Sequence, residues 1–167
     1  MISLILGNLC SILALIADSV SASRKTARGV LAFQSIGQFC YGVGAVLLKG
    51  YTGAVQNLVS ILRNFAAIRG NKNKLVEWGL IILGVGFSIW CNNLGLVGWL
   101  PILANLTYTL AVFRFQDDGR MLKMVSLVCI ALFCIFNLSI QNYVGAISNI
   151  IVFSSTVFFL LRQKKLA

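Results

Sequence analysis

The chain has 167 residues, of which 59% are hydrophobic and only 11% are charged, and its formal net charge is +10. This composition provides too little polar surface to cover a soluble globule, so it excludes a soluble domain and indicates a membrane protein. The length also leaves no room for a separate soluble domain beside the apolar segments.

Seven apolar runs follow one another along the chain, each close to the length of about 17 to 25 residues that a helix needs to cross a bilayer. Because lipid cannot hydrogen-bond an exposed backbone, helix is the only reasonable prediction for these runs. The predicted helices cover residues 2–21, 29–48, 53–68, 76–92, 98–113, 122–138 and 144–161. We therefore expect an all-α membrane protein with seven transmembrane helices.

The basic residues occur in small groups between the apolar runs. These groups are Arg24, Lys25 and Arg28; Arg69, Lys72 and Lys74; Arg114, Arg120 and Lys123; and Arg162, Lys164 and Lys165. The intervening connections hold only Lys49. This alternation predicts that every second loop and the C-terminus are cytoplasmic and that the N-terminus is outside. The basic loops are expected to contact membrane lipids, and no nucleic-acid partner is expected.

One short pattern occurs twice, at an offset of 92 residues. Tyr51, Gly53, Ala54 and Asn57 recur as Tyr143, Gly145, Ala146 and Asn149. The offset maps the first three helices onto the last three and leaves the fourth without a counterpart. We therefore predict a first three-helix bundle over residues 1–70, a linker helix within 71–96 and a second bundle over 97–167. With this extra helix the two bundles are parallel repeats.

Four side chains lie about 9 Å inside the bilayer from the cytoplasmic side, counted at about 1.5 Å per residue from the nearest basic residue. They are Asp18, Gln34, Arg63 and Tyr108. Asp18 and Arg63 are the only opposite charges well inside the spans, so their matching depth predicts an ion pair that closes an inner gate. Alternatively, Arg63 extends to the nearby interface and Asp18 caps a short helix.

A second group of polar side chains lies near the bilayer midplane. Asn57 and Asn149 occupy equivalent places in the two repeats, so a twofold axis would bring both amides to one site. Gln34, Gln38 and Tyr41 share one helix face. The amides could bind a polar ligand, or they could serve only as hydrogen-bonding contacts between helices.

On these features the chain resembles the SWEET and PQ-loop transporter superfamily, and within it the YgjV-type bacterial inner-membrane proteins. The resemblance implies that Asn57 and Asn149 contact substrate and that Tyr41 and Phe133 pack over it. The Pro-Gln pair that names the PQ loop is missing, because Ile16 and Ala17 occupy its place. The resemblance also implies a bacterial inner-membrane location.

The leading hypothesis is therefore a transporter that moves a small polar solute by alternating access between the two bundles. Asn57, Asn149, Tyr41, Phe133 and Gln38 would bind the solute, and Asp18, Arg63, Gln34 and Tyr108 would form the gate. The alternative is a non-transporting receptor or assembly factor that binds a peptide or lipid headgroup in the same cavity. A homo-oligomer is left open for either.

An enzyme is not expected from this sequence. The chain has no His, and its four acidic residues are scattered, so a Ser or Cys nucleophile would lack a base and no two carboxylates at membrane depth could share a proton or a metal. The five cysteines lie in apolar runs without a CxxC pair. We therefore expect neither a metal nor a cofactor.

Overall fold

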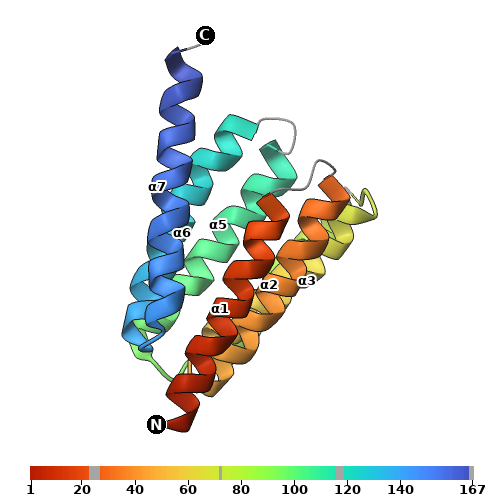
Figure 1. The fold of residues 1–167 in the computed structure, drawn as a ribbon. Helices are drawn as coiled ribbons and strands as arrows, with labels where there is room; N and C mark the ends of the chain where they lie inside the picture. The colour runs from red at the N-terminus through yellow and green to blue at the C-terminus, as the bar shows by residue number, and fades with distance from the viewer. Residues whose placement is uncertain (23–26, 72, 116–118, 166–167) are drawn as a thin grey trace.

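The computed structural model describes residues 1–22, 27–71, 73–115 and 119–165. In these ranges every regular element is helical. The elements are α1 (Ile2–Ala22), α2 (Ala27–Leu47), α3 (Tyr51–Ile68), α4 (Lys74–Trp90), the short 3-10 helix η1 (Gly95–Gly98), α5 (Trp99–Phe115), α6 (Gly119–Ser139) and α7 (Tyr143–Lys165). The all-α prediction and its seven helices are confirmed, and α7 continues past the predicted end at residue 161 (Figure 1).

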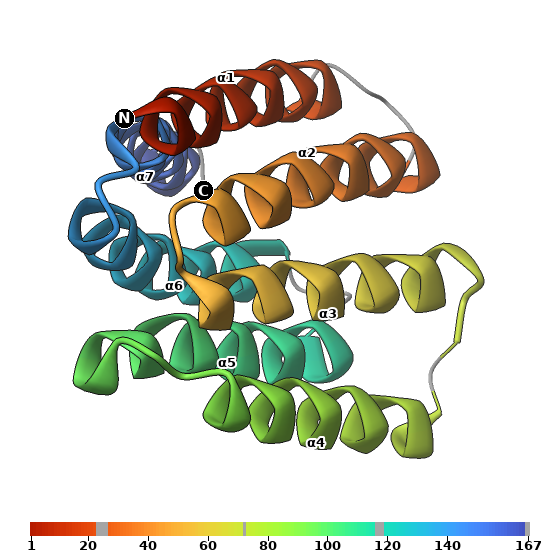
Figure 2. The same ribbon diagram turned by 90° about the horizontal axis from the view of Figure 1, so that it is seen from below.

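Six of the helices form a ring. Going round it, α1 packs on α2, α2 on α3, α3 on α5, α5 on α6, α6 on α7, and α7 returns to α1. The remaining helix, α4, packs on α3 and α5 from outside the ring (Figure 2). The contact between the first and last helices therefore closes the ring, and α4 packs against one side of it.

The distribution of side chains is the reverse of that in a soluble protein. Large apolar side chains point outward on every helix, with Phe39 63% exposed, Ile82 67% and Phe158 68%. Polar side chains occupy the interior, with Ser11 and Ser88 at 0% exposure. An apolar exterior of this extent is suited to lipid rather than to water.

Two segments of the described chain are individually long and apolar enough to cross a membrane. These are Ile2–Val20 and Gly95–Phe115. Shorter apolar helical segments are Leu31–Leu47, Met124–Ser139 and Tyr143–Phe158. The length and hydropathy of α1, and of η1 together with α5, are therefore those of a membrane span.

The connections from α2 to α3 and from α6 to α7 have the same backbone geometry. Lys49 and Gln141 both have φ of 60°, a left-handed conformation that is uncommon for residues other than glycine. In the first turn Gly50 N donates to Ala45 O at 2.7 Å, and in the second Asn142 N donates to Asn137 O at 2.8 Å. These bonds complete a Schellman motif, which ends α2 and α6 sharply and starts the next helix at once.

Glycine allows two of these helices to approach closely. Gly44 of α2 lies so near α1 that a Cβ atom there would be 2.9 Å from the carbonyl oxygen of Gly7. Close approach of small residues is a common basis for helix association in lipid, where burial of apolar surface gives no driving force. The α1–α2 contact is therefore set by backbone packing.

Candidate functional site

The helix ring encloses a cavity of about 580 Å³. All six ring helices contribute to its wall, and no residue of α4 does. Its polar lining consists of Asp18, Gln34, Gln38, Tyr41, Asn57, Ser60, Arg63, Asn64, Asn105, Tyr108, Ser126, Asn137, Asn142, Ser148, Asn149 and Thr156. Apolar groups complete the wall: Ala45, Ala104, Cys129, Ile130, Phe133, Phe136 and Val152.

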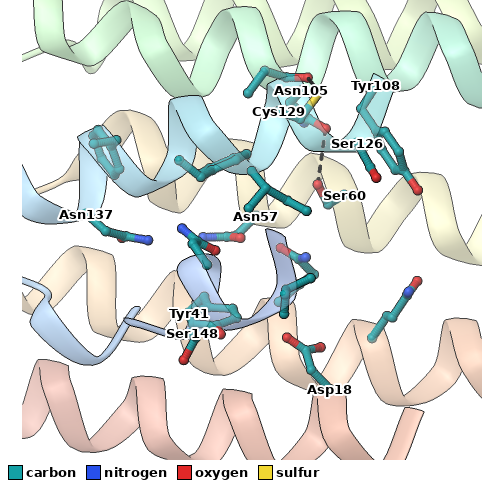
Figure 3. A pocket seen from close by; sticks show the side chains of 18 of the residues that line it. Asp18, Tyr41, Asn57, Ser60, Asn105, Tyr108, Ser126, Cys129, Asn137 and Ser148 are labelled. Atoms are coloured by element: carbon teal, nitrogen blue, oxygen red, sulfur yellow. Dashed lines mark hydrogen bonds between the residues drawn. The ribbon is translucent and has the colours of Figure 1, made fainter. Parts of the chain in front are cut away.

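All nine residues that the sequence singled out as solute-binding or gate residues line this one cavity. From α1, α2 and α3 they are Asp18, Gln34, Gln38, Tyr41, Asn57 and Arg63, and from α5, α6 and α7 they are Tyr108, Phe133 and Asn149. Figure 3 shows Tyr41 beside Ser148 and Asn57 pointing toward the centre. The helical spacing and estimated depth of these residues, together with the family resemblance, therefore led to side chains that line one cavity.

Arg63 is fixed by uncharged neighbours. Its Nη1 donates to Asn105 Oδ1 at 2.8 Å and to Thr109 Oγ1 at 3.5 Å. Its guanidinium carbon lies 4.9 Å from the centre of the Tyr108 ring, a cation–π distance. The side chain is only 6% exposed. Arg63 therefore does not extend to the membrane interface.

The predicted Asp18–Arg63 ion pair is not formed. Among the described residues no ion pair joins the two side chains, and Arg63 turns toward α5. Depth along a helix gives no information on the direction in which a side chain points around the axis. Because α2 lies between α1 and α3 in the ring, residues of equal depth on α1 and α3 need not meet. The prediction was wrong for this reason.

Asp18 lies on the opposite wall of the cavity from Asn105 and Tyr108 (Figure 3). Its carboxylate fits against α2 where that helix has no side chain, since a Cβ atom on Gly37 would be 2.6 Å from Asp18 Oδ1. No hydrogen bond from another described residue reaches this carboxylate. It is therefore an acceptor that faces the cavity.

Asn105 is the centre of a buried hydrogen-bond network. Its Oδ1 accepts from Arg63 Nη1 and from Ser60 Oγ, at 2.8 and 3.2 Å, and the second bond is drawn in Figure 3. Its Nδ2 donates to Gln56 Oε1 at 2.6 Å, and Gln56 Nε2 donates to Ser88 Oγ at 2.8 Å. The network joins α3, α4 and α5, so it braces one side of the cavity.

The two midplane asparagines have side chains that are free of this network. Asn149 Nδ2 is buried without a hydrogen-bond partner in the described part of the chain. Asn57 is 8% exposed, and no side-chain hydrogen bond from it to another described residue is found. A buried amide without a partner costs free energy, about 1 to 3 kcal/mol. Both residues line the cavity, and neither amide is held by a hydrogen bond to another described side chain.

Near Asn142, which lines the cavity, hydrogen bonds join α1 to the α6–α7 turn and the start of α7. Ser11 Oγ donates to Asn142 Oδ1 at 2.8 Å. Asn8 Nδ2 donates to Gln141 O at 3.2 Å, and Asn8 Oδ1 accepts from Val144 N at 3.1 Å. Figure 1 shows α1 and α7 close together here and apart at their other ends. We call these contacts the α1 clasp.

Several important lining residues were missed by the sequence reasoning, above all Asn105. Asn105 precedes Tyr108 by three residues, so both share a helix face, and this spacing could have identified it. Asn64 could have been found in the same way from Asn57, seven residues before it on α3. Asn142 gave no such signal, because it lies in a turn rather than in an apolar run.

The described residues contain no cluster of three or more His, Cys, Asp or Glu side chains that could hold a metal ion. The five cysteines are free thiols, and among them Cys129 is buried and donates its S–H to Ala104 O at 3.1 Å. The chemistry of this cavity is therefore that of hydrogen bonding, two charged groups and aromatic surface.

The amino-acid sequence matches the model of a known family over nearly its whole length. The sequence pattern of Imp-YgjV, described as bacterial inner membrane protein, matches residues 5–166. The chain belongs to this family. Its location is accordingly the bacterial inner membrane. No curated protein and no solved structure matches the chain.

Proposed function

We propose that this Imp-YgjV protein is a transporter or facilitator that carries a small polar solute across the inner membrane through the cavity inside the helix ring. The observation that carries the proposal is the pair of amides, Asn57 and Asn149, which both line this cavity of about 580 Å³ and make no side-chain hydrogen bond to another described residue. This volume lies in the range of small-molecule sites, about 300 to 1,000 Å³. A solute that satisfies these amides would offset the cost of burying them.

The proposed mechanism is alternating access between two three-helix units, α1–α3 and α5–α7. Support comes from the positions that face the cavity, because seven pairs of lining residues are 92 residues apart. They are Gln34 and Ser126, Gln38 and Ile130, Tyr41 and Phe133, Ala45 and Asn137, Asn57 and Asn149, Ser60 and Val152, and Asn64 and Thr156. Equivalent faces of two equivalent units thus surround one solute.

The helix bounds support the same repeat. α2 (Ala27–Leu47) and α6 (Gly119–Ser139) begin and end 92 residues apart, and so do the first residues of α3 and α7. The left-handed residues Lys49 and Gln141 keep this offset. In this layout α4 links two parallel repeats, and the α1 clasp forms the outer gate.

The proposed orientation places the N-terminus outside and the C-terminus in the cytoplasm, with seven spans. The grouping of Lys and Arg in alternate connections supports it. A reporter that fluoresces only in the cytoplasm, fused after Ala167, is expected to be bright. Fluorescence from the same reporter fused before Met1 instead would contradict the orientation.

The experiment that tests the function measures solute uptake into proteoliposomes by the full-length protein and by the double variant Asn57→Ala, Asn149→Ala. We expect the double variant to lose at least 90% of the flux, because both halves of the site lose their hydrogen-bonding groups. The matched control is Asn71→Ala, Asn93→Ala, which changes two asparagines outside the cavity lining and is expected to keep the flux.

Two results would contradict the proposal. Unchanged flux in the double variant would show that solute does not pass Asn57 and Asn149. Tight binding without flux for every solute tested would favour the alternative function, a receptor or assembly factor that uses the same cavity.

A further inference from the structure

The cavity contains a buried cation that no acidic residue in the described part of the chain neutralises. Arg63 is 6% exposed and its hydrogen-bond partners, Asn105 and Thr109, are uncharged. Of the acidic residues that the structure describes, neither Asp18 nor Glu77 pairs with it. The Tyr108 ring and the Asn105 amide position the guanidinium, but they leave its charge in place. Removing an uncompensated charge from water is costly, so this site favours an anionic partner.

The opposite wall contains the complementary group. The Asp18 carboxylate lies against Gly37 and faces the same cavity, and no cation among the described residues lies close enough to influence it. Among the described residues, one carboxyl group and one guanidinium, neither of them in an ion pair, therefore lie on two walls of a single space. The two side chains are fixed by different neighbours, Asp18 by α2 and Arg63 by α5.

We propose that the solute is a small zwitterion whose ammonium group binds Asp18 and whose anionic group, a carboxylate in the simplest case, binds Arg63. This proposal rests on the proposed function and names the substrate class for the same cavity. Asn57 and Asn149 then bind the polar atoms between the two charges, and the Tyr41 and Phe133 rings contact the apolar part.

The balance of charge in the cavity distinguishes a zwitterionic solute from an anion, a cation or a sugar. An anion alone would neutralise Arg63 and leave Asp18 buried without a partner, and a cation alone would do the reverse. A sugar would leave both charges uncompensated. A zwitterion neutralises both and keeps the total charge of the cavity unchanged during the passage, which avoids moving net charge through the low-dielectric membrane.

The test compares matched probes with the full-length protein in proteoliposomes and in thermal unfolding with added solute. The zwitterions are L-leucine, 4-aminobutyrate and L-alanyl-L-alanine, which differ in the distance between their charges. For leucine the matched analogues are 4-methylpentanoate, which lacks the ammonium group, and 3-methylbutylamine, which lacks the carboxylate. Glucose is the uncharged probe. We expect at least one zwitterion to move and to be preferred at least tenfold over matched analogues that lack one charge.

Two variants separate binding from folding. Asp18→Asn is expected to move the preference at least tenfold toward the analogue without an ammonium group, and Arg63→Gln toward the analogue without a carboxylate. Such a gain for one probe cannot arise from misfolding. Arg63→Lys keeps the charge and is expected to retain zwitterion flux in part.

The outcomes distinguish the two proposals. Flux of glucose with no flux or competition by any zwitterion would overturn the substrate class and leave transport standing. Equal binding of a zwitterion and its singly charged analogue would also overturn it. No flux of any probe, together with no stabilisation, would count against both proposals.

Discussion

At the residue scale, the function of each cavity side chain depends on whether its polar atoms already have partners. Asn105 uses both ends of its amide, toward Arg63 and Ser60 and toward Gln56. Asn149 leaves its Nδ2 without a partner in the described chain. Two asparagines that line the same cavity are therefore expected to behave differently, one as structural support and the other as a ligand contact.

This contrast gives a prediction for stability. Asn105→Ala removes the acceptor of Arg63 and the donor to Gln56, so it is expected to lower the free energy of unfolding in detergent by about 2 kcal/mol or more. Asn149→Ala is expected to change it by less than about 0.5 kcal/mol, because no hydrogen bond of its Nδ2 is lost. Equal losses for the two variants would show that Asn105 is not the centre of the network.

The sequence predicted nine of the residues that line the cavity but not which of them bond to one another. Gln34, Gln38 and Tyr41 recur with helical spacing, so their common face followed from geometry. The partner of Arg63 depends on the packing of α3 against α5, which a depth count along single helices does not contain. For that reason Asn105 was not identified as the partner of Arg63, and an ion pair with Asp18 was expected.

At the element scale, the fold depends on glycine positions at which two helices come into close contact. Gly53, near the start of α3, faces Phe136 of α6, and a Cβ atom there would be 2.5 Å from the Phe136 ring. Phe136 itself is 2% exposed and cannot move aside easily. This contact joins the two halves of the ring next to the α2–α3 turn.

The corresponding prediction uses two glycines with different surroundings. Gly53→Ala is expected to lower the free energy of unfolding by about 1 to 3 kcal/mol, because the added methyl group overpacks the contact with Phe136. Gly79→Ala on α4 is the matched control, since nothing lies within 4 Å of its Cβ position, and it is expected to be neutral or slightly stabilising. Thermal unfolding midpoints in the same detergent would measure both. A neutral Gly53→Ala would contradict close packing here.

Helix positions were more predictable than helix partners. Apolar runs separated by basic groups defined all seven helices, because in lipid the backbone must satisfy its own hydrogen bonds. The ring order, with α4 outside, could not be predicted, since any outward face of a membrane helix is apolar whichever neighbours it has. The α1 clasp was missed too, because Asn8 and Asn142 are far apart in sequence.

At the scale of the whole molecule, the ring encloses polar groups and presents apolar groups outward, so the proposed solute path lies inside the protein and the outer face suits lipid. Equivalent positions of the two units line the cavity. The charged residues are an exception, because the counterparts of Asp18 and Arg63 are the uncharged Leu110 and Ser155. A symmetric scaffold with an asymmetric pair of charges is suited to a solute whose two ends differ.

The measurement that tests the central claim most directly is solute counterflow. Proteoliposomes are preloaded with unlabelled solute, and labelled solute is added outside at low concentration. A carrier that alternates access around one site is expected to accumulate label transiently above equilibrium, and the Asn57→Ala, Asn149→Ala variant is expected to show no such accumulation. Simple equilibration without this overshoot, or an overshoot that survives loss of both asparagines, would contradict alternating access at this cavity.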